Sequence, residues 1–81
     1  MKASVKIRLK SGILDPQGLT VKNALLHLGF GNIKNVRIGK LIELEIDDST
    51  NDEAQKMIEK ACNKLLANPV IEDYTYTINE D

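Results

Sequence analysis

Side chains able to do nucleophilic chemistry are scarce in this sequence, which has a single histidine, His27, and a single cysteine, Cys62. A nucleophilic cysteine needs a neighbouring base or cation that activates its thiol. No histidine lies near Cys62 in the sequence, and Cys62 falls on an apolar stripe, where lone cysteines are usually small buried residues. His27 lies beside another apolar stripe and is interpreted as a solvent-exposed helix residue. We therefore predict no catalytic residue.

Metal binding would require clustered ligands, and only two acidic pairs stand out. Asp47 and Asp48 precede a predicted helix, where negative charge is favourable without any metal. Glu72 and Asp73 lie in a predicted strand and face either solvent or a partner. Motifs of the phosphate-binding, dinucleotide-binding and nucleophile-elbow kinds are missing. We therefore predict no metal-binding and no cofactor-binding residue in this chain.

The composition indicates a small, nearly neutral domain. With 11 basic and 12 acidic residues, the chain has no positive excess to attract nucleic acid or an anionic membrane. The single cysteine and the absence of a signal peptide favour a cytoplasmic location. A length of 81 residues predicts one domain, residues 1–81, with marginal stability. Sharing a core with a second chain would relieve this, so we expect an oligomer.

A strand and a helix are predicted in the first third of the chain. Apolar and polar residues alternate over residues 3–9, which is typical of a half-buried strand. Over residues 21–28 the apolar residues recur at helical spacing, and Gly29 follows as a natural helix stop.

Two starts are open for this helix. Asp15 followed by Pro16 is a good N-cap and first-turn pair, and Thr20 is a second candidate cap. If Asp15 is the N-cap, Leu14 and Leu19 occupy the two positions of a hydrophobic staple, which fixes the angle at which the chain enters the helix.

Gly18 and Ile13 have no local role in that scheme. A helix that starts at Asp15 places Gly18 in its first turn, where alanine would be favoured by up to about 1 kcal/mol. We expect the glycine to permit close approach of another backbone, with Ile13 on the same contact surface. Gly18→Ala would then leave the isolated chain as stable as the wild type or slightly more stable, and would weaken assembly with a partner. If the helix starts at Thr20 instead, Gly18 needs positive φ and alanine destabilises the chain.

Residues 36–46 read as one long strand. The apolar residues all have even numbers: Val36, Ile38, Ile42, Leu44 and Ile46. A hairpin turn at Gly39 and Lys40 would reverse this parity and bury glutamates, so we exclude it and expect at most a kink at Gly39. Eleven residues span about 36 Å, whereas a compact domain of this length is about 30 Å across. One end of the strand should therefore leave its own core.

A second helix and a last strand complete the chain. Thr50 and Glu53 form a capping-box pattern ahead of an apolar stripe that runs to about residue 65, and Asn68-Pro69 ends the helix. Residues 70–78 alternate again as a strand. The order β-α-β-α-β with a long central strand predicts an α+β domain of ferredoxin-related class. We expect an antiparallel sheet with two helices on one face, in an oligomer.

The ferredoxin-like class hosts several functions, so the fold does not decide among them. An RNA-recognition sheet would need stacking aromatics, and this chain has one Phe and two Tyr. An acylphosphatase would need an arginine in the loop after the first strand, which holds only Lys10. A domain that senses a small molecule remains an alternative, and ligand-induced thermal stabilisation would distinguish it.

Four motifs together carry a resemblance to a known family. They are "LDPQG" at 14–18, "ALLHLGF" at 24–30, "VRIGK" at 36–40 and "CNKLLANPVIEDY" at 62–74. Their order and spacing closely resemble the PurS family, the small subunit of phosphoribosylformylglycinamidine synthase. The resemblance covers essentially the whole chain, although residues 47–60 carry no family signature.

The resemblance implies a non-catalytic subunit in de novo purine synthesis. It implies three partners: further copies of this chain in a dimer or tetramer, a large synthetase subunit and a glutaminase subunit. The large subunit would bind ATP and Mg²⁺, and this subunit would bridge the other two and support ammonia transfer between them. Residues of the matched motifs, with Ile13, are then candidates for the subunit interface: Ile13, Asp15, Gln17, Gly18, Arg37, Lys40, Asn68, Glu72, Asp73 and Tyr74.

Overall fold

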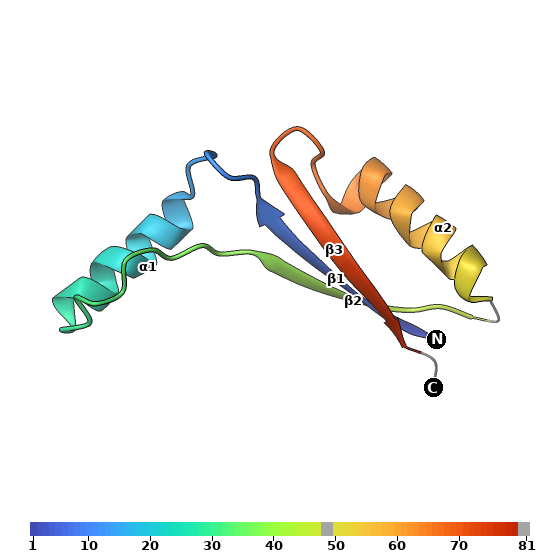
Figure 1. Cartoon of the computed structure of the whole chain (residues 1–81), viewed down its shortest axis with the longest axis horizontal. Helices are drawn as coiled ribbons and strands as arrows, with labels where there is room; N and C mark the ends of the chain where they lie inside the picture. The colour runs from blue at the N-terminus through green and yellow to red at the C-terminus, as the bar shows by residue number, and fades with distance from the viewer. Residues whose placement is uncertain (48–49, 80–81) are drawn as a thin grey trace.

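The structure is a computed structural model that describes residues 1–47 and 50–79. Its elements follow the predicted β-α-β-α-β order, with a short π-helical turn after the second helix (Figure 1). They are β1 (Lys2–Leu9), α1 (Pro16–His27), β2 (Lys40–Glu45), α2 (Asn51–Ala61), η1 (Cys62–Leu66) and β3 (Glu72–Asn79). Asp48, which was predicted to favour the start of α2, lies outside the described residues.

The three strands form one antiparallel sheet in the order β2-β1-β3. Val5 of the central strand lies opposite Ile42 on one side and Tyr76 on the other. The alternating apolar residues of the three strands therefore lie on the same face of the sheet. Ala3, Val5 and Ile7 are 0–2% exposed, which confirms the alternation predicted for residues 3–9. Full burial of a side chain as large as Val5 or Ile7 contributes about 1.5–3 kcal/mol to stability.

Helix α2 covers this apolar face and packs mainly over β3 (Figure 1). Thr50 caps α2 as predicted, because its Oγ1 accepts a hydrogen bond of 3.2 Å from the Glu53 N–H. Ile58 and Cys62 are almost fully buried against the sheet, which confirms the interpretation of Cys62 as a small core residue. Burial raises the pKa of the Cys62 thiol and keeps it protonated and inert.

Helix α1 does not lie on the sheet, which corrects the prediction of two helices on one face. It projects from the end of the sheet and returns through an extended segment that ends at β2 (Figure 1). The radius of gyration is 16.2 Å, whereas a compact domain of this length would have about 12 Å. Apolar periodicity identified the helix but not the surface that covers its stripe. We call residues 16–36 the arm.

The predicted strand over residues 36–46 is shorter in the structure. Only Lys40–Glu45 pairs with β1, although Ile42 and Leu44 of β2 do face the core, and no hairpin forms at Gly39. Residues 36–39 are not part of the sheet because the Ile38 N–H is bonded to the carboxylate of Asp15 instead of a strand carbonyl. The expectation that one end leaves the core is confirmed.

Candidate interaction surface

Asp15 joins the start of α1 to the returning chain. Its Oδ1 accepts a hydrogen bond of 2.9 Å from the Gly18 N–H, and its Oδ2 accepts one of 2.8 Å from the Ile38 N–H. The residue is only 7% exposed. The hydrogen bonds from Ile38 and Gly18 hold the pKa of Asp15 below its ordinary value. The start at Asp15 is thereby confirmed, and Thr20 lies inside the helix, where its hydroxyl donates to the Pro16 carbonyl.

Arg37 makes the complementary connection in the opposite direction. Its guanidinium donates hydrogen bonds to three backbone carbonyl oxygens of the outgoing chain: Ile13 at 2.9 Å, Lys10 at 3.2 Å and Leu9 at 3.3 Å. The planar guanidinium carries five N–H donors in a fixed fork, and two of its nitrogens reach these carbonyls, whereas a lysine has only one donor nitrogen. We call Asp15 and Arg37 together the clamp.

Gly18 is packed against the same junction. It is buried, and a Cβ atom on it would collide with the Val36 carbonyl oxygen. Gly18 has helical dihedrals rather than the positive φ that a start at Thr20 would have required. The expected close approach of a backbone is therefore present, but that backbone belongs to the same chain.

The far end of α1 closes as predicted. Gly29 has a φ of 98°, which is the left-handed conformation that favours glycine. Its N–H donates to the Leu26 carbonyl and the Phe30 N–H donates to the Leu25 carbonyl, which is the Schellman pattern. The side chain of His27 is exposed in the last turn, as interpreted from the sequence.

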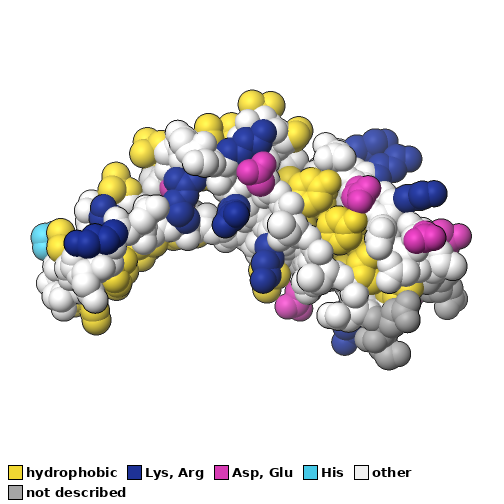
Figure 2. Space-filling model, in the orientation of Figure 1, with side chains coloured by type: hydrophobic (Ala, Val, Ile, Leu, Met, Phe, Trp, Pro, Cys, Tyr) yellow, Lys and Arg dark blue, Asp and Glu magenta, His cyan; other side chains and the backbone are white. Residues whose placement is uncertain are grey.

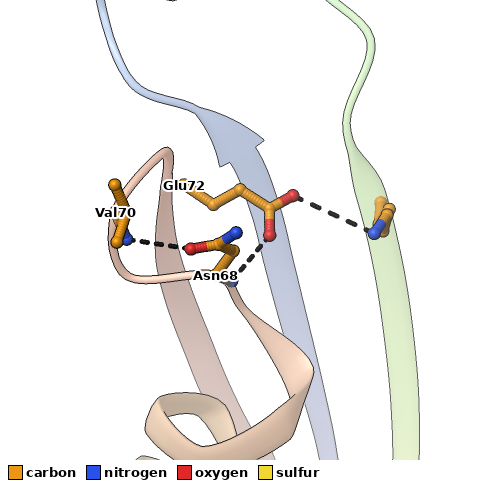
Figure 3. A network of polar contacts seen from close by, with 4 residues as sticks. Asn68, Val70 and Glu72 are labelled. Atoms are coloured by element: carbon orange, nitrogen blue, oxygen red, sulfur yellow. Dashed lines mark hydrogen bonds and ion pairs between the residues drawn. The ribbon is translucent and has the colours of Figure 1, made fainter.

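The fourth motif forms a second polar cluster, where η1 leads into β3 (Figure 3). Glu72 Oε1 accepts from the Asn68 N–H at 2.7 Å, and Asn68 Oδ1 accepts from the Val70 N–H at 3.0 Å. Glu72 Oε2 also lies 3.9 Å from the Lys40 Nζ of β2. The largely exposed ammonium makes this ion pair worth little, so the turn is held chiefly by its backbone contacts.

The predicted interface residues all lie at the end of the sheet from which the arm leaves. The clamp brings four of them together: Ile13, Asp15, Gly18 and Arg37. The turn before β3 brings together three more: Lys40, Asn68 and Glu72. Asp73 is exposed beside Arg8, Tyr74 packs against the core, and Gln17 is exposed in the first turn of α1. Each has a place within its own chain, and contact with a partner stays a prediction.

Sequence reasoning missed the extent of the exposed apolar surface. Along the arm, the exposed large apolar residues are Leu19, Val21, Leu26, Leu28 and Phe30, with Leu28 at 73% exposure (Figure 2). The two staple residues are also exposed, at 74% for Leu14 and 49% for Leu19. The signal was the run "ALLHLGF", which has more apolar residues than a single helical stripe needs.

The sheet has a matching uncovered area. Because α2 packs mainly over β3, the core-facing residues of β2, Ile42 and Leu44, and Ile46 just after it are only half-buried. An apolar arm and a partly open apolar sheet face therefore coexist in one chain. Exposed apolar surface on this scale marks a site of protein interaction.

The opposite face of the sheet carries a groove of about 580 Å³ near the clamp. Basic side chains line it, namely Lys6, Arg8, Arg37 and Lys40, together with Asp73. Within residues 1–47 and 50–79, no three acidic, histidine or cysteine side chains are placed to share a metal ion. No helix in this described part is long and apolar enough to cross a membrane.

The fold and its exposed surfaces are those of a protein-binding subunit: polar side chains hold the backbone in place, while apolar side chains stay uncovered. A family model described as PurS, phosphoribosylformylglycinamidine (FGAM) synthase, matches residues 2–80. The PurS subunit of this synthase from Bacillus subtilis is 44% identical over 79 residues, which are 98% of this chain and 93% of the relative.

Solved structures agree with the family match. PurS from Methanocaldococcus jannaschii superposes with a TM-score of 0.88 at 41% identity, covering 99% of this chain and 96% of the other. A chain in the structure of PurLQS from Thermotoga maritima gives 0.85 at 33% identity, with 94% and 93% covered. This chain belongs to the PurS family, the small subunit of phosphoribosylformylglycinamidine synthase in purine biosynthesis. This membership favours the assembly subunit over the sensing domain.

Proposed function

We propose that this chain bridges the large synthetase and glutaminase subunits of phosphoribosylformylglycinamidine synthase and supports the passage of ammonia between them. The observation that carries the proposal is the match, over 94% of this chain, to a chain in the structure of PurLQS. ATP and Mg²⁺ bind to the large partner under this proposal, and the whole assembly works in the cytoplasm.

Self-association is part of the same proposal. The apolar arm and the half-covered face of β2 are complementary in character, and the arm of each chain points away from its own sheet (Figure 1). Two copies related by a two-fold axis would each lay an arm on the other's sheet and so cover both surfaces. Burying this apolar area in a dimer would add the stability that a core of this size lacks.

Reconstitution tests the bridging role. The chain alone should hydrolyse neither glutamine nor ATP. Added to the large and glutaminase subunits, it should restore glutamine-dependent formation of the amidine product, while ammonia-dependent formation by the large subunit changes less. Full glutamine-dependent activity of the two other subunits without this chain would refute the bridging role.

A further inference from the structure

The arm is joined to the sheet by two single-chain crossings, residues 10–15 going out and residues 37–39 coming back. No residue of α1 belongs to the buried core cluster, and Gly18 is the only buried residue of the helix. The direction of the arm must therefore be set at the two crossings rather than by packing against the sheet.

The clamp connects these crossings in both directions. From the outgoing crossing, Asp15 holds the backbone of the returning one through the Ile38 N–H. From the returning crossing, Arg37 holds the carbonyls of Leu9, Lys10 and Ile13. These contacts span 23 to 28 residues of sequence, so breaking them would free the arm without removing any residue from the core.

We propose that Asp15 and Arg37 are positioning residues for assembly: the clamp fixes the direction of the arm so that its apolar face meets a second copy of the chain. This inference rests on the self-association in the proposed function. A freely swinging arm would lose conformational entropy on association, whereas a clamped arm is pre-organised for it. Because both carboxylate oxygens of Asp15 are occupied and the residue is buried, its influence on assembly is exerted through the arm and not through partner contact.

Two conservative variants test the clamp. Asp15→Asn keeps the size of the side chain but presents an amide N–H₂ where one of the two backbone donors points. Arg37→Lys keeps the charge but has one donor nitrogen in place of the two guanidinium nitrogens that reach the three carbonyls. Matched controls make the same changes elsewhere: Asp52→Asn in the exposed first turn of α2, and Arg8→Lys on the open face of the sheet.

The measured quantities are the dissociation constant of the self-associated form, by sedimentation at a series of concentrations, and the reactivity of Cys62 with a thiol reagent. Both clamp variants should raise the dissociation constant about tenfold or more, as expected for loss of hydrogen bonds to charged groups. Cys62 should stay protected, because it is fully buried in the core away from the arm. The controls should associate as the wild type does.

A small-angle scattering measurement separates positioning from general stabilisation. For the dissociated chains, the radius of gyration of the clamp variants should move away from that of the wild type, which a purely stabilising contact would not cause. Clamp variants with protected Cys62 that associate as tightly as the wild type would overturn the clamp proposal alone. If Cys62 becomes reactive in Asp15→Asn, the core of that variant is disturbed, and the dissociation constant of Arg37→Lys then tests the clamp proposal. A wild type that stays monomeric would overturn self-association as well, while the reconstitution assay would still report on bridging.

Discussion

The backbone carbonyl of Val36 occupies the space that a side chain on Gly18 would need. This contact joins the first turn of α1 to the returning chain at the clamp, and Asp15 Oδ2 lies 2.9 Å from the same Cβ position. A glycine that is locally unfavourable in a helix is thus explained by tertiary packing.

Gly18→Ala should lower the stability of the isolated chain by about 1–3 kcal/mol, because either the helix or residue 36 must move. The structure therefore reverses the expectation that alanine would be tolerated. Urea unfolding measures the effect. Gly31→Ala is the matched control, since a Cβ there meets only Leu26 at 3.7 Å and φ is not positive. Equal midpoints for Gly18→Ala and the wild type would contradict the close contact.

Asp15 should contribute a pH-dependent part of the stability. Hydrogen bonds from Ile38 and Gly18 depress the pKa of its carboxyl group in the folded chain. Such a group stabilises the fold fully above its unfolded pKa of about 3.9, and the contribution is lost as pH falls through the lower folded value. The difference in unfolding free energy between wild type and Asp15→Asn should therefore be constant above about pH 5 and should narrow in acid. A difference that stays the same down to pH 2 would argue against the two hydrogen bonds.

Cys62 should matter for packing and not for chemistry. Cys62→Ala should lower the stability by about 1 kcal/mol through a small cavity, and Cys62→Ser should lower it further because a hydroxyl would be buried in an apolar core. Thermal melts rank the three proteins. Under the bridging proposal, the synthase reconstituted with the alanine variant should keep its activity. A lower turnover number when the variant is fully incorporated into the complex would point to a chemical role for Cys62.

The exposed apolar residues of the arm should control self-association. Leu26 and Leu28 are 57% and 73% exposed, so replacing both with glutamine should leave the isolated fold intact and shift the chain toward monomer in light scattering. Leu65→Gln is the matched control, because Leu65 is 82% exposed on η1, far from the arm in sequence. If the control dissociates the oligomer and the arm variant does not, the contact surface lies on the α2 side.

Local rules were enough to predict much of this protein from its sequence. The alternation over residues 3–9 and the even phase of β2 depend only on the two-residue period of a strand. The caps at Asp15 and Thr50 are equally local, because each satisfies an N–H three residues ahead in its own helix. The order of elements followed from the same patterns.

Only the tertiary structure decided where the arm points. Its direction depends on the hydrogen bonds from Arg37 to the Ile13 carbonyl and from the Ile38 N–H to Asp15. It also depends on the missing side chain of Gly18, whose place the Val36 carbonyl occupies. These contacts join residues 18 to 24 positions apart in the sequence. Hydrophobic periodicity records which side chains avoid water but not which surface covers them. The sequence therefore identified α1 as a helix rich in apolar residues, and the clamp placed this helix beyond the edge of its own core.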